Sequence, residues 1–69
     1  MSLVPVKSSN IAEIGYSGTE LHVKFRGGDK VYVYEGVPEK LHQELMDAES
    51  VGQFFSKHIK AGGFKHRVI

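Results

Sequence analysis

The sequence predicts an α+β fold, in which a three-stranded antiparallel β-meander is followed by two helices packed on one of its faces. Two observations carry this prediction. Apolar and polar residues alternate through the first half of the chain, most regularly in the segment LHVKFR, as they do in a strand with one buried face. Beyond Pro38 the apolar residues recur every three or four positions, which is the spacing of a buried helix face.

Length and composition set the limits of this fold. The chain has 69 residues, enough for one small domain spanning residues 1–69. It contains no cysteine, so packing must stabilise the domain without disulfides or a thiolate zinc site. No segment approaches the ~20 apolar residues of a membrane span, and the N-terminus lacks the apolar stretch of a signal peptide. We therefore expect a cytoplasmic protein that does not associate with membranes.

The first two strands follow from the alternation of residue types. The segment IAEIGY, residues 11–16, places Ala12 and Ile14 on one side of a strand and Ile11 on the other. The side with Ala12 is the better core face. The turn SGTE then leads into the second strand, residues 21–26, which is the clearest half-buried strand of the chain.

The third strand, KVYVYEG, raises the question of which face its tyrosines occupy. A two-residue turn at 28–29 places Tyr32 and Tyr34 on the face of Phe25, whereas a three-residue turn at 27–29 places them on the opposite face. Glycine at the first position of a two-residue turn suits type II′, whose twist matches the strands. We therefore expect both tyrosines to face the core.

The same register turns the two valines of this strand to the outer face of the sheet. Val31 and Val33 would then form an apolar strip. The residues alone do not decide whether this strip is exposed to a partner.

Helical signals begin at Pro38, which suits the first turn of a helix over residues 38–49. A second helix is expected over residues 50–61, because Ser50 and a glutamine three positions later match a capping box. The two glycines at 62–63 end it. The remaining residues form either a short C-terminal strand or a frayed tail.

Three separated motifs resemble a known family. They are SSNI at residues 8–11, YVY with the following GVP at residues 32–38, and SVG with Phe55 and Ile59 at residues 50–59. In this order they resemble the KTSC domain, named for its occurrence at the C-terminus of some lysyl-tRNA synthetases and also found in stand-alone bacterial and phage proteins. The resemblance implies a β-meander with helices, a suspected role in RNA binding and no catalytic residues. It marks these structural motif residues: Tyr32, Tyr34, Gly36, Pro38, Phe55 and Ile59.

Basic residues gather at the C-terminal end, where the segment KHIKAGGFKHR contains no acid and interleaves cations with aromatic rings. Phosphates require several cations on one surface, and bases stack on aromatic planes. A solubilising helix face is the alternative interpretation. The candidate nucleic-acid-binding residues are Lys57, Lys60, Lys65 and Arg67, extended by the strand residues His22, Lys24 and Arg26.

Catalytic, cofactor and metal sites are not expected. The chain has no Walker loop, and its GYSGT segment lacks the spacing of a nucleophile elbow. The four histidines lack the spacing of a metal site. His58 is expected to be a core histidine bonded to a strand rather than a catalytic base.

Two functions remain from the sequence. The first is RNA or tRNA binding through the basic end. The second is a protein-interaction module, such as a homodimer, that uses Val31 and Val33 or the acidic helix at residues 38–49. RNA binding ranks first because of the family resemblance.

Overall fold

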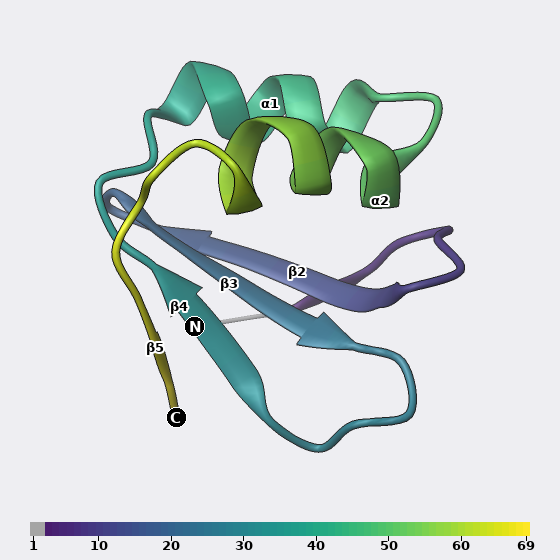
Figure 1. Ribbon diagram of the computed structural model, residues 1–69. Helices are drawn as coiled ribbons and strands as arrows, with labels where there is room; N and C mark the ends of the chain where they lie inside the picture. Colours follow the sequence, from purple (N-terminus) through teal and green to yellow (C-terminus); the bar gives the residue numbers. More distant parts are fainter. Residues whose placement is uncertain (1–2) are drawn as a thin grey trace.

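A computed structural model describes residues 3–69 and has an α+β architecture (Figure 1). Its antiparallel sheet has five strands in the order β1-β2-β3-β4-β5, with the helices over one face. The strands are β1 (Val4–Pro5), β2 (Ile11–Ser17), β3 (Glu20–Phe25), β4 (Val31–Tyr34) and β5 (His66–Val68). The helical segments are α1 (Glu39–Asp47), α2 (Val51–Phe54) and the π-helical η1 (Phe55–Lys60).

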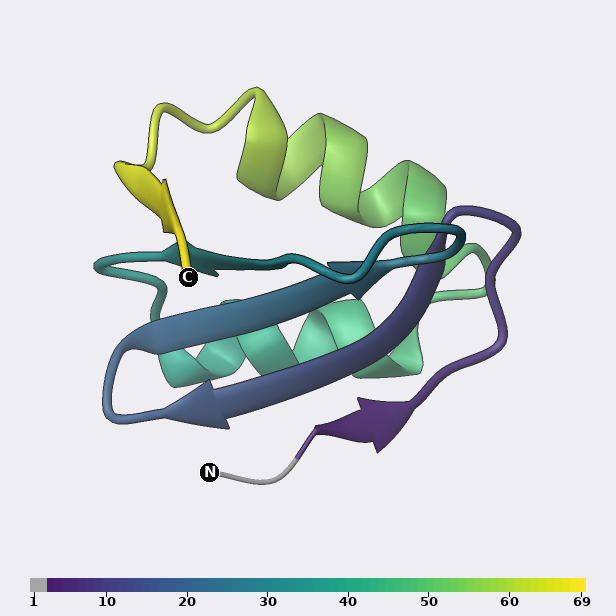
Figure 2. The same cartoon turned by 90° about the horizontal axis from the view of Figure 1, so that it is seen from below.

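The predicted meander corresponds to β2, β3 and β4, and the sheet is wider than predicted by one strand at each edge (Figure 2). The C-terminal residues, for which the sequence allowed either a short strand or a frayed tail, form the strand β5. β1 was not predicted, because it has only two residues and one of them is Pro5. Proline cannot donate to a ladder and is confined to edge strands such as this one.

A β-bulge changes the inward face of β2. The pairing with β3 shifts register between Ile11 and Glu13. Ile11 and Ile14 therefore both face the helices, and they are 0% and 1% exposed. The prediction that Ala12 rather than Ile11 belongs to the core side is wrong, because strict alternation does not anticipate the extra residue of a bulge.

The tyrosines of β4 face the core, as predicted. Val23 pairs with Tyr32, and Leu21 pairs with Tyr34. The predicted two-residue turn at 28–29 is wrong, since the observed pairing is displaced by two residues. A displacement by an even number keeps each side chain on its face, so the predicted orientation survives the error in the turn.

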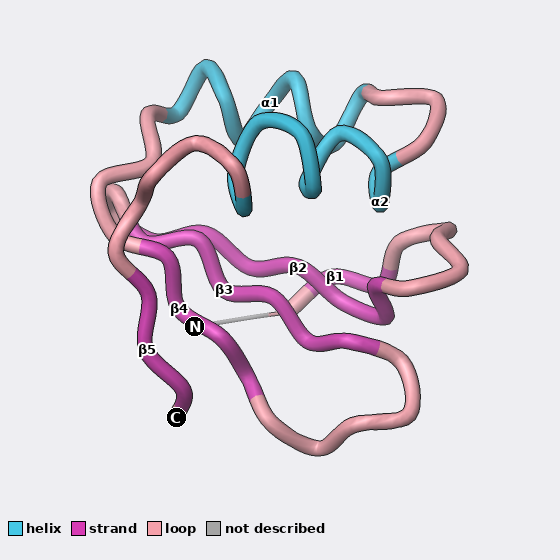
Figure 3. Tube along the Cα trace, in the orientation of Figure 1, coloured by secondary structure: helices cyan, strands magenta, loops and turns pink. Residues whose placement is uncertain are grey.

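The connection between β3 and β4 is a loop longer than the predicted two-residue turn (Figure 3). Its first residue, Arg26, bonds to the loop before β2 and not to β4. The backbone N–H of Arg26 donates to the carbonyl of Asn10 at 2.8 Å. Its side-chain Nε donates to the carbonyl of Ser8. These bonds hold Arg26 beside the loop that precedes β2 instead of in a tight hairpin with β4.

Both helical segments cover the predicted face of the sheet, with boundaries close to those expected (Figure 1). Pro38 is the N-cap of α1 rather than its first helical residue. Ser50 caps α2, its hydroxyl accepting from the backbone N–H of Gln53 at 3.4 Å. The core between helices and sheet includes Phe55 and Ile59.

The outer face of the sheet has its own cover. Val33 is 0% exposed, which answers the question of its availability to a partner. It pairs with His22 on β3 and with Arg67 on β5. Because Arg67 reaches Glu20 on β3 from the far side of β4, its side chain passes over the strand that carries Val33.

Helix length bears on one further expectation. Within residues 3–69, no helix combines the length and the apolar character needed to cross a membrane.

Candidate nucleic-acid interface

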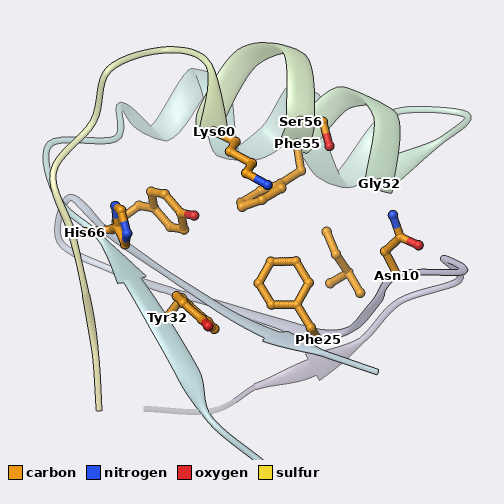
Figure 4. Close-up of a pocket in the computed structure, with 10 residues that line it drawn as sticks. Asn10, Phe25, Tyr32, Gly52, Phe55, Ser56, Lys60 and His66 are labelled. Atoms are coloured by element: carbon orange, nitrogen blue, oxygen red, sulfur yellow. The ribbon is translucent and has the colours of Figure 1, made fainter. Parts of the chain in front are cut away.

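A pocket of about 390 Å³ lies between the sheet and the second helical segment (Figure 4). Strands β3, β4 and β5 form its floor and one side, α2 and η1 form its roof, and the loop before β2 closes the far end. Its lining residues are Asn10, Ile11, Phe25, Tyr32, Tyr34, Gly52, Phe55, Ser56, Lys60 and His66.

Aromatic rings make up the walls of this pocket. Phe25 meets Tyr32 edge to face, with ring centroids 5.4 Å apart, and meets Phe55 in the same way at 5.6 Å. The imidazole of His66 stacks on Tyr34 at 5.1 Å. Burial raises the pKa of Tyr34, and the neighbouring Tyr32 adds to this effect. The phenol of Tyr34 is therefore held in its neutral form.

The roof of the pocket owes its composition to the π-helical geometry of η1. The backbone N–H of Ala61 donates to the carbonyl of Ser56, five residues earlier, at 3.2 Å. In an α-helix, residues five apart point about 140° away from one another. The wider π turn brings Phe55 and Lys60 toward the same side, and both line the pocket. Such segments are often found at functional sites.

The loop before β2 is fitted closely against α2. The hydroxyl of Ser8 accepts from the backbone N–H groups of Asn10 and Ile11, each at 3.2 Å, and so caps the turn before β2. A Cβ at Gly52 would lie 3.0 Å from this hydroxyl. The absence of a side chain at Gly52 therefore lets the helix approach the loop and brings Asn10 to the pocket.

Three of the predicted basic residues lie on this side of the molecule. Lys57 and Lys60 are exposed on η1, and a second hollow beside the pocket is lined by Lys57 together with Asn10 and Ser56. Arg26 reaches the same loop from the end of β3. The structure thus gathers these cations around the loop that contains Asn10.

Arg67, His22 and Lys24 lie on the outer face instead. Arg67 bonds to Glu35 at 2.7 Å and to Glu20 at 3.3 Å. The hydrogen bonds to Glu20 and Glu35 raise the pKa of the guanidinium. The structure therefore does not join Arg67 to the lysines of η1, although the sequence grouped them.

His22 and Lys65, two further members of the predicted set, differ in their surroundings. His22 is nearly buried, and its Nε2 atom has no hydrogen-bond partner among residues 3–69 and lies 3.7 Å from Glu20. Lys65 is exposed in the segment before β5, where its carbonyl accepts from the backbone N–H of Glu35 at 2.8 Å.

His58 corrects another expectation. It was expected in the core, but it is exposed, and its ring packs against Phe54 with centroids 4.3 Å apart. Phe55 and Ile59 occupy the inward side of the helix, which leaves His58 on the outward side.

The structural motif residues occupy positions that explain their types. Gly36 has a φ of +76°, a left-handed conformation that favours glycine. Pro38 has a φ of −66° at the N-cap of α1, within the range fixed by its ring. Phe55 and Ile59 are 2% and 0% exposed and join the helix to the sheet.

A second aromatic cluster, not identified from the sequence, lies between α1 and β2. The rings of Tyr16 and His42 stack at 4.4 Å, and the Tyr16 hydroxyl donates to the carbonyl of Val37. Burial lowers the pKa of His42, against a smaller opposing effect of Glu39. In the part of the chain that the structure describes, no group of three or more potential metal-ligating side chains comes together.

Comparison with known proteins identifies the family. The family model of the KTSC domain matches residues 7–64. The chain belongs to the KTSC domain family. The crystal structure of a KTSC domain protein from Yersinia pestis is similar to it, with a TM-score of 0.90 and 44% sequence identity, over 99% of this chain and 96% of that one.

Two further relatives support the assignment. An uncharacterized protein of Stutzerimonas stutzeri is 32% identical over 68 residues, covering 96% of this chain and 94% of the relative. A protein of Tsukamurella paurometabola is 40% identical over 58 residues, covering 81% of this chain and 85% of the relative.

The three motifs that carry the resemblance to the KTSC domain converge on the pocket. The first contributes Asn10, the second Tyr32 and Tyr34, and the third Gly52 and Phe55. The sequence predicts that Tyr32 and Tyr34 face the core, but it does not predict that the three motifs share a cavity. Their shared location depends on the packing of the helix and the strands around one cavity.

Proposed function

We propose that this KTSC domain is a non-catalytic, cytosolic RNA-binding module, whose contact surface is the exposed side of η1 and the mouth of the adjacent pocket. The observation that carries the proposal is the position of Lys57 and Lys60 beside a pocket walled by aromatic rings. Among residues 3–69, neither lysine forms an ion pair. Both ammonium groups are therefore open to phosphate.

The chemistry of single-stranded RNA suits this surface. Cations follow the phosphate backbone, and aromatic rings receive bases without strong sequence preference. Arg26 extends the positive surface toward the loop before β2. The hydroxyl of Ser56 and the amide of Asn10 add neutral hydrogen-bonding groups between the cations and the rings.

RNA binding is tested by fluorescence anisotropy with a labelled single-stranded RNA of mixed sequence over a range of salt concentrations. The double variant K57Q/K60Q should bind more weakly, and the dependence of its log affinity on log salt should flatten by about one unit per lost contact. The matched control K30Q/K40Q removes the same charge from two exposed lysines away from the pocket and should bind like the parent. Equal weakening of both variants, or no binding by the parent at low salt, would contradict the proposal.

A protein-interaction function is the second candidate, and exposed apolar residues at the sheet edges favour it. Val68 is 47% exposed on β5, and Val4 is 50% exposed on β1. Edge strands with exposed apolar side chains are templates for pairing with another chain. A molecular mass of a dimer in sedimentation equilibrium, unaffected by RNA or salt, would favour this function over RNA binding.

A further inference from the structure

We infer that the pocket binds one nucleotide unit, its base held between the aromatic walls and its phosphate at Lys60. This inference rests on the proposed RNA-binding function and names the part of the RNA that the pocket would receive. Figure 4 shows Lys60 descending from the roof beside Phe55, with Phe25 and Tyr32 below. His66 and Asn10 lie at opposite ends.

Size and shape fit a flat ring. The volume of about 390 Å³ falls within the roughly 300–1,000 Å³ of small-molecule sites. The rings of Phe25 and Phe55 are inclined at 73° to each other, and those of Phe25 and Tyr32 at 79°. The pocket therefore offers both faces and edges of rings, which are the surfaces on which a base packs.

The charges at the pocket favour an anionic group at one end. Lys60 is the one permanent cation among the lining residues, and the lining residues within the described part of the chain include no Asp or Glu. A phosphate at Lys60 is therefore not repelled by a carboxylate of the pocket wall. The neighbouring Lys57 continues the positive surface toward the next phosphate of a strand.

Polar groups are placed to meet the edge of a base. The side chain of Asn10 carries a donor and an acceptor, a combination that can pair with a base edge. The carbonyl oxygen of its amide accepts from the Ser9 hydroxyl at 3.3 Å. The amide NH₂ of Asn10 makes no hydrogen bond among residues 3–69, so a base acceptor can take it.

The test uses adenosine monophosphate (AMP) as the probe and follows the backbone amide resonances of the intact domain by NMR. AMP should shift the resonances of Gly52, Ser56 and His66 in a saturable manner. Adenosine should shift the same resonances at higher concentration, because it lacks the phosphate. Ribose 5-phosphate should shift them least, because it lacks the aromatic base. K60Q should raise the Kd for AMP about tenfold, as expected for loss of one charge-assisted hydrogen bond, without changing the Kd for adenosine.

Two matched variants separate ligand binding from structure. K60R restores the charge and should recover most of the affinity for AMP, whereas K40Q, on the exposed side of α1, should bind AMP like the parent. The inference is overturned if AMP leaves the pocket resonances unchanged, or if K60Q weakens AMP and adenosine equally.

A final arm distinguishes a nucleotide of a strand from a free mononucleotide and separates this inference from the proposed function. A short single-stranded RNA that shifts the pocket resonances and is displaced by AMP supports binding of a nucleotide within a strand. If RNA binds through Lys57 and Lys60 but leaves the pocket resonances unmoved, the inference fails and the RNA-binding proposal stands. If AMP shifts the pocket resonances but the RNA binds neither there nor at Lys57 and Lys60, the RNA-binding proposal fails, and with it the assignment of the pocket to RNA.

Discussion

The two faces of the sheet use basic residues in opposite ways. On the face covered by helices, Lys57 and Lys60 lie beside the pocket and form no ion pair among residues 3–69. On the outer face, Arg67 lies between Glu20 and Glu35. All three cations belong to the same basic segment of the sequence. Cations that are close together in the sequence can therefore lie on opposite faces of the sheet. Here η1 keeps Lys57 and Lys60 on the helix side, and strand β5 turns Arg67 to the outer face.

Strand β5 makes this division between adjacent residues. His66 faces the helices and stacks on Tyr34, while the next residue, Arg67, pairs with Val33 and faces outward. A phosphate at Arg67 would have to compete with two carboxylates, whereas a phosphate at Lys60 would not. The outer face therefore pairs its arginine with carboxylates of the same chain, and the helix side is the one to which we assign ligand binding in our proposal.

The largest expected effect is on the helix side. Tyr34→Ala should lower the free energy of unfolding by about 3–5 kcal/mol, because it removes a large ring from the core. A domain of this size has about that much stability in total. Much of the variant should therefore be unfolded already at the start of a urea titration, before urea is added. A loss below about 1 kcal/mol would contradict the inward orientation of the tyrosine.

The outer face should show a smaller but measurable effect of the same kind. Val33→Ala removes two buried methyl groups and should cost about 2 kcal/mol in the same titration. Val31→Ala, at a partly buried position of the same strand, should cost less and serves as the control. Equal costs for the two variants would indicate that Val33 is not covered by its own chain.

A pH-dependent effect is expected at the edge where α1 meets β2. Burial lowers the pKa of His42 in the folded state, so the unfolded chain, with a pKa of about 6.5, binds the proton more readily. The stability contributed by neutral His42 is therefore complete above about pH 6.5 and is lost as the pH falls through the folded pKa. His42→Phe keeps a ring against Tyr16 and should remove this part of the pH dependence in urea titrations between about pH 7.5 and about pH 5.5. An unchanged pH dependence would place the cause elsewhere.

The smallest expected effect belongs to the exposed ion pairs. Arg67→Gln should lower the Tm slightly at low salt and less at high salt, because exposed pairs are screened. Lys57→Gln, which breaks no ion pair among residues 3–69, should leave the Tm unchanged. A difference in Tm between R67Q and the parent that does not shrink with salt would contradict the pairing with Glu20 and Glu35.

The sequence could predict those features that depend on local periodicity. The alternation of β3 and the helical spacing of apolar residues beyond Pro38 predicted the meander and the helices. The inward face of Tyr32 and Tyr34 was predicted from a two-residue turn that the structure does not have, and it holds because the observed register differs by an even number of residues. The two-residue strand β1 and the bulge at Ala12 could not be predicted in this way, since neither follows a regular period.

The candidate site was less predictable because it depends on contacts between distant segments. Lys60 was selected for its charge, but its place beside Phe55 required a π-helical turn. Asn10 and His66 meet the pocket only because β5 pairs with β4 and the missing side chain of Gly52 lets the loop before β2 approach α2. The sequence does carry one signal for the site, because neighbouring residues of a strand point to opposite faces. Once the terminal segment is known to be a strand, this alternation predicts that His66 and Arg67 lie on opposite faces.

The difference between the two faces is tested most directly by titrating the unmodified domain with a short single-stranded RNA and following every backbone amide by NMR. We expect the shifted resonances to cluster at Gly52, Ser56, Lys57 and Lys60, with those of Lys24 and Arg67 unmoved. The clustering of shifts at Lys24 and Arg67, with the η1 resonances unmoved, would contradict the assignment of ligand binding to the helix side.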